Sequence, residues 1–213
     1  SSVEASDNIT VFNSLSWDRD AFVELPDGYT SVEGGETQKI GDKVYAKVSV
    51  PACGFKSYRL GNGKAAQTAN DNNLILENNL IKAEFNQKGE LISIFDKESR
   101  TEFLSQPSNV FRMYRDMSCF FDAWDIDAYY EKEEVALTEP AEISVEYKGE
   151  LESCISIKKK INRSYITQKA ILRKDSKRID FETEVDWKET HKLLKVDLNS
   201  NIHTEEMVSE TQY

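Results

Sequence analysis

The sequence predicts an all-β protein whose antiparallel sheets pack face to face. The first reason is an alternation of side chains with a period of two, clearest at Val44, Ala46, Val48 and Val50. Such a period places every second side chain on the same face of a strand. The second reason is that polar turns, rather than segments with a helical period, separate the strands, as is typical of antiparallel sheets.

Residues 1–62 are expected to form a small antiparallel β domain. Strands are predicted at 9–12 and 22–25, and the second ends at the turn signal Pro26-Asp-Gly28. The alternating stretch 44–50 and a strand at 55–60 complete this unit. Residues 63–73 are rich in Gly, Ala, Asn and Gln and are predicted to be a linker.

Residues 74–213 are expected to form a second, larger β domain. Its first two strands flank Asn78-Asn79, which predicts a hairpin turn, and the polar stretch 96–106 is predicted to be a loop. Trp17 and Trp187 stand at strand ends beside alternating apolar residues, so both are expected to pack in the core. The strands predicted for this domain are 74–76, 80–85, 91–95, 110–114, 143–147, 155–157, 166–172, 179–187 and 192–198.

The acidic composition narrows the classes of partner. The 213 residues carry a net charge of −11, which argues against nucleic acid and against an anionic membrane surface. No apolar run has the length of a membrane span, and the first residues lack the features of a signal peptide. Because the chain starts at Ser1, we expect it to be a piece of a longer protein.

Three cysteines, Cys53, Cys119 and Cys154, are widely spaced. They include no Cys-x-x-Cys pair, so neither a disulfide framework nor a thiolate zinc site is expected. Free thiols are typical of a reducing compartment, which predicts a cytoplasmic location.

Two basic clusters have a structural and a functional interpretation. Lys158-Lys-Lys160 is interpreted as a solvated strand edge, where lysines discourage edge-to-edge association. Arg173, Lys174, Lys177 and Arg178 surround a turn, so they form either an anion-binding patch or the charged tip of a hairpin.

The densest mixture of carboxylates and large aromatic side chains is Asp122-Ala-Trp-Asp-Ile-Asp127, continuing through Tyr129 and Tyr130. Proteins hold sugars by stacking an aromatic ring on the C–H face and by accepting hydroxyl hydrogens with carboxylates. Asp122, Trp124 and Asp125 are therefore the candidate substrate-binding residues. The alternative is a structural corner whose aromatic side chains are buried.

No catalytic residue or metal ligand is predicted within the chain. Glycoside hydrolysis commonly uses two carboxylates, but residues three apart on a strand, such as Asp122 and Asp125, point to opposite faces. The two histidines, His191 and His203, are separated by a predicted strand, which is a weak basis for a metal site. No phosphate-binding loop, Ser nucleophile elbow or Cys–His pair stands out.

Four stretches in order resemble the C-terminal β region of the family 38 glycoside hydrolases, the zinc-dependent α-mannosidases. The most specific is Asp122-Ala-Trp-Asp-Ile-Asp127. The others are Val11-Phe-Asn-Ser-Leu-Ser-Trp17 with Arg19, then Leu76-Glu-Asn-Asn-Leu80 running on through Gly89-Glu-Leu-Ile-Ser-Ile-Phe-Asp96, and Val185-Asp-Trp-Lys-Glu-Thr-His-Lys-Leu-Leu-Lys195.

The resemblance implies a small β-sandwich followed by part of a larger supersandwich of the galactose-mutarotase type. It also implies a parent enzyme that cleaves α-mannosides with retention. In that family the nucleophile and the zinc ligands lie in an N-terminal α/β barrel, so zinc is expected there and none of those roles is carried over to this chain.

The sequence hypothesis is thus a non-catalytic β-sandwich portion of a cytoplasmic α-mannosidase. Its expected partners are the catalytic barrel of the same parent chain and a mannose-containing carbohydrate, and a homo-oligomer is conceivable. By itself the chain is expected to be inactive. Two alternatives stay open: an independent carbohydrate-binding β-sandwich, and a purely structural module whose apolar patch is covered by the barrel.

Overall fold

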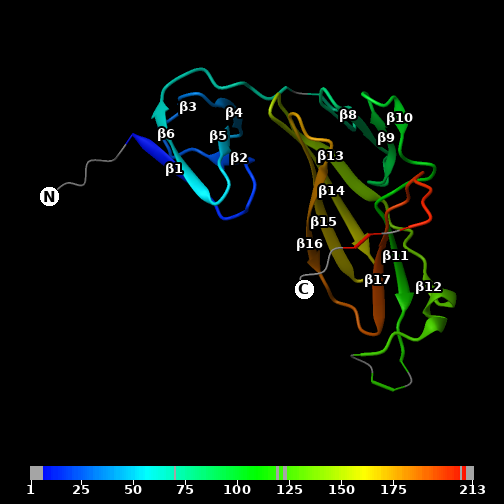
Figure 1. The fold of residues 1–213 in the computed structure, drawn as a ribbon. Helices are drawn as coiled ribbons and strands as arrows, with labels where there is room; N and C mark the ends of the chain where they lie inside the picture. Colours follow the sequence, from blue (N-terminus) through cyan, green and yellow to red (C-terminus); the bar gives the residue numbers. More distant parts are fainter. Residues whose placement is uncertain (1–6, 70, 119, 122–123, 207, 210–213) are drawn as a thin grey trace.

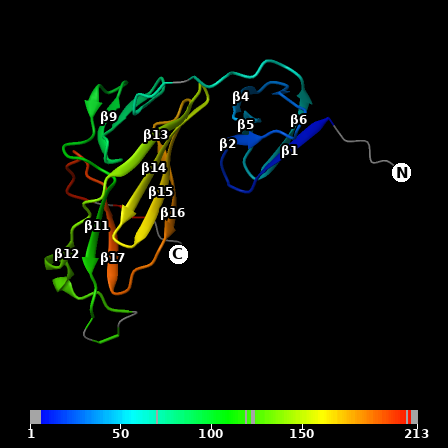
Figure 2. The same ribbon diagram turned by 180° about the vertical axis from the view of Figure 1, so that it is seen from behind.

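The all-β prediction is confirmed. A computed structural model describes residues 7–69, 71–118, 120–121, 124–206 and 208–209, and in this part of the chain the strands form five antiparallel sheets (Figure 1). The only helical element among these residues is one short 3-10 turn, η1 (Ala128–Lys132). The first six strands lie together at one end of the molecule, and the others form a longer body beside them (Figures 1 and 2).

The N-terminal strands form two small sheets, ordered β1-β6-β3 and β2-β5-β4. Strand β5 shows the predicted alternation: Val44, Ala46, Val48 and Val50 are buried, and they share a core with residues such as Tyr58. The strands are β1 (Asn8–Asn13), β2 (Arg19–Glu24), β3 (Ser31–Val32), β4 (Glu36–Ile40), β5 (Lys43–Val50) and β6 (Gly54–Gly61).

The longer body contains three sheets, ordered β10-β9-β8-β7, β13-β14-β15-β16 and β12-β11-β17. Leu76 and Phe85 of the first sheet share one buried cluster with Ile155 and Leu172 of the second, which is the expected face-to-face packing. The strands are β7 (Ile75–Glu77), β8 (Ile81–Phe85), β9 (Leu91–Asp96), β10 (Thr101–Glu102), β11 (Val110–Arg115), β12 (Glu134–Val135), β13 (Ala141–Lys148), β14 (Glu152–Ile161), β15 (Ser164–Arg173), β16 (Ile179–Asp186) and β17 (Lys192–Asp197).

The predicted hairpin turn at Asn78 is confirmed. The Asn78 side chain explains why this turn is stable. The Asn78 Oδ1 atom accepts hydrogen bonds from the backbone N–H groups of Leu80 (2.8 Å) and Ile81 (2.9 Å). Its Nδ2 atom donates to the carbonyl oxygens of Arg173 (2.8 Å) and Ser176 (2.7 Å). One amide therefore both closes the β7–β8 turn and ties it to the turn between β15 and β16.

The stretch 96–106 is not entirely a loop, because β10 pairs with β9 there. The Glu102 carboxylate fixes this short pairing: it accepts hydrogen bonds from the backbone N–H groups of Ile94 (2.8 Å) and Leu104 (3.0 Å) and from the Ser93 hydroxyl (2.5 Å). A polar composition predicts a loop, whereas here one carboxylate supplies the acceptors that order the segment.

The tryptophans assigned to the core are not buried. The exposed fraction is 59% for Trp17, which lies in the turn after β1, and 42% for Trp187, which follows β16. Strand β16 pairs only with β15, and the later half of it is exposed. Both predictions fail because the apolar pattern identifies a strand but not whether another layer covers its face.

Lys158–Lys160 does not lie on a sheet edge. It belongs to β14, which pairs with β13 on one side and β15 on the other. Lys158 and Lys160 are exposed, whereas Lys159 is buried. Adjacent side chains on a strand point to opposite faces, so a run of three lysines necessarily sends the middle one to the other face.

A second turn of the longer body is held by a buried acid. The Glu189 carboxylate accepts hydrogen bonds from Asn162 Nδ2 (2.7 Å), the Arg163 backbone N–H (2.7 Å) and the Ser164 hydroxyl (2.9 Å), all in the β14–β15 turn. Burial raises the pKa of Glu189, but these bonds outweigh it and leave the pKa below its usual value.

The two groups of strands meet at one fully buried side chain, Gln38 of β4. Its Oε1 atom accepts hydrogen bonds from the backbone N–H groups of Leu151 (2.7 Å) and Glu152 (3.1 Å), and its Nε2 atom donates to the Glu152 carbonyl (2.9 Å). The segment predicted as a linker is anchored nearby, since Ala66 pairs with the β4 backbone and Ala69 with Lys148. The domain boundaries at residues 62 and 74 stay a prediction.

We predict that Gln38→Ala lowers the free energy of unfolding by about 2–4 kcal/mol, because it leaves buried backbone groups at the start of β14 without partners. Urea unfolding followed by circular dichroism measures this. Gln67→Ala is the control, because Gln67 is exposed and, within the described part of the chain, its amide donates to the Ala65 carbonyl alone. Equal unfolding midpoints for the two variants would contradict the assignment.

Asp96 generates a second prediction. Lys177 Nζ lies 2.8 Å from its Oδ2, and the backbone N–H groups of Glu98 and Ser99 donate to its Oδ1, each at 2.9 Å. These interactions, Lys177 first, lower the pKa of Asp96 to about 2. A lowered pKa means that the stabilisation is complete above about pH 4 and is lost as the pH falls through 2.

Lys177→Met is therefore expected to raise the Asp96 pKa, which a ¹³C NMR titration of the carboxyl group measures. Lys174→Met is the matched control, because Lys174 pairs with Glu36 and Glu150 instead. The assignment is wrong if Asp96 titrates near its ordinary value in the unmodified chain.

Candidate functional site

The aromatic–carboxylate cluster of the sequence lies in a loop at one end of the longer body. The chain leaves the β12-β11-β17 sheet at Arg115 and returns at Glu134, and Figure 1 shows this segment at the lower end of β11. Two backbone hydrogen bonds close the loop, from Arg115 N to Glu133 O (2.8 Å) and from Asp116 N to His191 O (3.0 Å). We call residues 116–133 the aromatic loop.

The tip of the aromatic loop presents its rings to solvent. The Phe121 carbonyl accepts hydrogen bonds from the backbone N–H groups of Trp124 (2.7 Å) and Asp125 (3.0 Å), so both candidate residues sit on one tight turn. Phe121 has a φ of 48°, which is uncommon for a residue other than glycine. Trp124 is 91% exposed, and Phe120, Phe121 and Asp125 are exposed as well. Asp122 lies outside the described residues.

The interpretation of Trp124 as part of a buried corner is therefore wrong. A side chain this exposed contributes little to the core, whereas a large aromatic face in water is available for stacking.

Side chains from several elements contact one another at the base of the loop. The rings of Tyr114 and Tyr130 meet edge to face, with centroids 5.2 Å apart and an interplanar angle of 85°. Lys195 Nζ donates to the Tyr130 hydroxyl (2.6 Å) and lies 4.9 Å from the centroid of its ring. Tyr114 of β11 and Lys195 of β17 thus hold Tyr130 of η1 in place, and Tyr130 forms one wall of a hollow under the loop.

A hollow of about 220 Å³ lies under the aromatic loop. It is smaller than the roughly 300–1,000 Å³ of typical ligand pockets, so it can take only part of a ligand. Its carboxylates and tyrosines are groups that hold hydroxyls, yet Glu133 was not singled out in the sequence, because only the folded loop brings it beside Asp116. The lining residues are Arg115, Asp116, Met117, Asp127, Tyr129, Tyr130 and Glu133.

The described residues offer no metal site. No group of three or more His, Cys, Asp or Glu side chains among them has the arrangement of a metal centre. His191 and His203 are both exposed. The described residues therefore provide no ligand set for the zinc ion, which the sequence resemblance associates with a different part of the parent protein. The described residues also include no helix with the length and apolarity needed to span a membrane.

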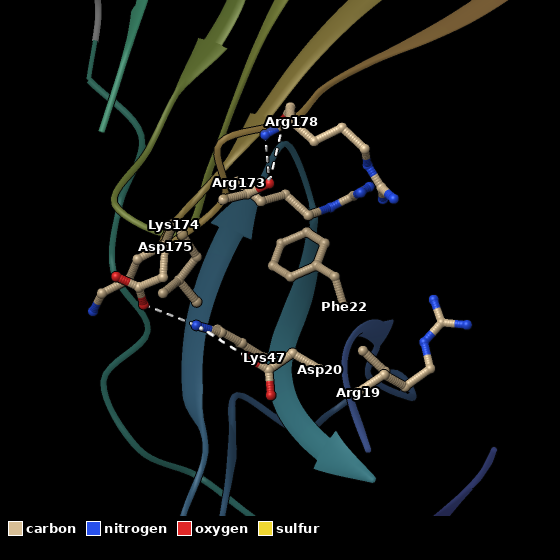
Figure 3. A pocket seen from close by; sticks show the side chains of 11 residues that line it. Arg19, Asp20, Phe22, Lys47, Arg173, Lys174, Asp175 and Arg178 are labelled. Carbon is tan, nitrogen blue, oxygen red and sulfur yellow. Dashed lines mark hydrogen bonds and ion pairs between the residues drawn. The ribbon is translucent and has the colours of Figure 1, made fainter. Parts of the chain in front are cut away.

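The basic turn between β15 and β16 packs against the N-terminal strands, around a hollow of about 400 Å³ (Figure 3). Each cation of the turn, and Lys47 of β5, has an acidic partner. Lys174 pairs with Glu36 (2.5 Å), and Lys47 of β5 pairs with Asp175 (3.0 Å) and Asp20 (3.4 Å). The remaining pairs are Arg173 with Glu152 and Asp180, Lys177 with Asp96 and Glu98, and Arg178 with Asp180.

The charges of this turn are therefore largely neutralised within the protein. Pairs of this kind cross between the two groups of strands and supplement the Gln38 hydrogen bonds. The cluster is not a free anion-binding patch. It is the charged tip of the β15–β16 hairpin, as the alternative interpretation predicted, and its ion pairs with Lys47 and Glu36 also join it to the N-terminal strands.

The fold and the loop define a class: an antiparallel β-sandwich protein with an exposed aromatic–carboxylate loop at the end of one sheet. Residues 76–213 match the family model described as "Glycosyl hydrolases family 38 C-terminal domain". The chain belongs to this family, and the resemblance inferred from the sequence is confirmed.

Three curated proteins are similar to this chain. "Alpha-mannosidase 2C1" from Mus musculus is 24% identical over 218 residues, which cover 96% of this chain and 20% of that protein. "Alpha-mannosidase G" from Dictyostelium discoideum is 22% identical over 235 residues, 98% of this chain and 22% of that protein. "Alpha-mannosidase 2C1" from Homo sapiens is 26% identical over 147 residues, 67% of this chain and 14% of that protein. The chain spans about a fifth of the length of the mouse and Dictyostelium proteins.

We predict that Trp124→Ala changes the free energy of unfolding by less than about 0.5 kcal/mol, because the side chain makes little contact with the core. Met113→Ala is the contrasting variant: Met113 is fully buried in the cluster of Phe111, Ile161 and Ile166, and its loss should cost about 2–5 kcal/mol. Denaturant unfolding of both variants measures the difference. A large loss of stability in Trp124→Ala would mean that the ring packs against the protein in solution.

Proposed function

We propose that this chain is the non-catalytic β-sandwich portion of a retaining, zinc-dependent α-mannosidase. Membership of the family supports this proposal, as do the names of the related proteins, which are α-mannosidases. In this proposal the nucleophile, the acid and the zinc ion belong to a catalytic barrel elsewhere in the parent chain. The β-sandwich supports that barrel.

The exposed aromatic loop is the single observation that carries a more specific role. We propose that it forms part of the wall around the sugar substrate, with Trp124 as the stacking platform and Asp122 and Asp125 as hydrogen-bond acceptors. A ring that is 91% exposed on a loop with a tyrosine base suits this task, because stacking on a sugar requires an accessible face. The hollow beneath would accept one edge of the sugar.

We also propose a location and an oligomeric state for the parent protein. The parent acts in the cytoplasm, in agreement with an exposed free thiol at Cys53 and a buried one at Cys154. A homo-oligomer of the parent is compatible with the exposed apolar side chains around β16 and β17, which include Trp187 and Leu198.

The second candidate function is an independent carbohydrate-binding module. The hollow beside Tyr129 and Tyr130 favours it, because this chain by itself brings carboxylates and tyrosines together there. The two proposals differ in what the isolated chain does: a module binds mannose oligosaccharides by itself, whereas a wall of a larger cleft binds them weakly or not at all.

We expect the purified chain to show no hydrolysis of an aryl α-mannoside, with or without added zinc, because the groups that perform the chemistry are proposed to lie elsewhere. Release of the aryl alcohol, followed by absorbance, measures this. Turnover above the rate of a heat-denatured sample would overthrow the proposal.

A titration with mannose oligosaccharides, followed by tryptophan fluorescence, separates the two candidates. A saturable change that disappears in Trp124→Phe, and persists in the control Trp17→Phe, would favour the independent module. No change at millimolar sugar would leave the wall of a larger cleft as the function of the loop.

A further inference from the structure

A second hollow, of about 660 Å³, lies in the longer body. It is bounded by the turn between β8 and β9, the start of β11, the segment 134–140 and strand β14. None of the described residues that line it belongs to the aromatic loop. Its volume falls within the roughly 300–1,000 Å³ of typical ligand pockets.

Lys159 gives this hollow its chemical character. It lies on β14 between Ile157 and Ile161, both buried, and only 8% of it is exposed. Within the described parts of the chain it has neither a hydrogen-bond acceptor nor an ion-pair partner. Burial lowers the pKa of Lys159, because the charged ammonium loses water, while Glu90 opposes this effect. No buried side-chain nitrogen or oxygen atom of the described residues lacks a hydrogen-bond partner, so the Lys159 ammonium is not sealed off from the hollow. Its stem is buried, and its Nζ atom is open to the hollow, where a ligand oxygen can accept a hydrogen bond from it.

The other charged side chains around the hollow differ in whether they are already paired or are free to bind a ligand. Arg112 and Glu134 are 3.0 Å apart, and Arg112 also pairs with Asp197 (2.5 Å), so these groups neutralise one another. Glu90 accepts a hydrogen bond from Asn86 Nδ2 (2.8 Å) and keeps further acceptor capacity. Glu139 is exposed and is not hydrogen-bonded to any described residue. Lys88 also lines the hollow, is exposed, and adds a second ammonium group beside Lys159. The hollow thus offers donors at Lys88 and Lys159 and acceptors at Glu90 and Glu139.

Apolar side chains complete the lining, among them Val110, Leu137 and Pro140. A carboxylate or phosphate ligand would satisfy Lys159 but would meet the two acidic side chains. A ligand with hydroxyl groups can accept from the ammonium and donate to the carboxylates, while its C–H face packs on the apolar wall. The lining therefore selects for an uncharged, polyhydroxylated molecule.

We propose that this hollow is a saccharide-binding site, separate from the aromatic loop, which takes an uncharged sugar or short oligosaccharide. Lys159 donates to a hydroxyl oxygen at the bottom of the site, and Glu139 accepts a hydroxyl hydrogen near its mouth. This site does not depend on the proposed role of the loop, because the two share no described lining residue.

An NMR titration of the ¹⁵N-labelled chain with methyl α-mannoside and with a mannose disaccharide tests the proposal. Saturable shifts are expected in the backbone amides of residues 88–90 and 134–139. Lys159→Met should weaken binding about tenfold or more, because a hydrogen bond from a charged donor is lost. Lys160→Met is the matched control, since this neighbouring lysine is exposed on the opposite face.

A second variant keeps the test decisive if Lys159→Met fails to fold. Glu139→Gln should weaken binding about fivefold while leaving the fold intact, because the side chain is exposed, and Glu142→Gln on β13 is its control. Sodium acetate and sodium phosphate are titrated in parallel. Bound sugar should also raise the pKa of Lys159, measured by NMR, since an acceptor favours the ammonium form.

Three results would overturn the proposal: no saturable shift in these amides, sugar-induced shifts confined to residues 116–133, or acetate or phosphate binding here more tightly than the sugars. The second result would locate sugar binding in the aromatic loop and would leave the proposed function of that loop standing. Failure of this site and failure of the loop are thus distinguishable in a single titration.

Discussion

Buried backbone groups at the ends and turns of strands require hydrogen-bond partners, and this requirement determines how the sheets of this protein are joined. Within a sheet the strands satisfy one another, but where a strand begins or turns a side chain has to take over. Gln38 does this for the start of β14, Asn78 for the β7–β8 turn, and Glu189 for the β14–β15 turn. Each side chain also links segments far apart in the sequence. The same side chain therefore completes the hydrogen bonds of a turn or strand end and holds two parts of the fold together.

The presence or absence of a hydrogen-bond or ion-pair partner also separates structural polar groups from candidate functional ones. The basic turn between β15 and β16 looks like an anion site in sequence, but acidic partners neutralise its cations and join it to the N-terminal strands. Lys159 is the opposite case, since its stem is buried on β14 and its ammonium group opens into a hollow instead of pairing with a described carboxylate. A cation that faces a hollow can donate to a ligand, whereas a cation held in an ion pair is already satisfied.

For the aromatic loop, the argument for a binding role is the exposure of its side chains. A sheet scaffold positions a loop at its end, and loops placed in this way commonly carry binding residues. The pair of Tyr114 and Tyr130 anchors the loop, while Trp124 stays accessible. Family membership places this arrangement in the C-terminal region of glycoside hydrolases of family 38. The loop and the Lys159 hollow are the two separate surfaces of the β-sandwich for which we propose carbohydrate binding.

The sequence by itself determined the all-β class, most strand positions and the family, because a period of two and a set of ordered motifs are local properties of the chain. It also located the aromatic loop, since rings and carboxylates are adjacent there. Only the tertiary structure decided which face of each strand is covered, and so it placed Trp17 and Trp187 at the surface and Lys159 inside. Burial, pairing of charges and the lining of a hollow depend on residues distant in sequence, and alternation along one strand carries no information about them.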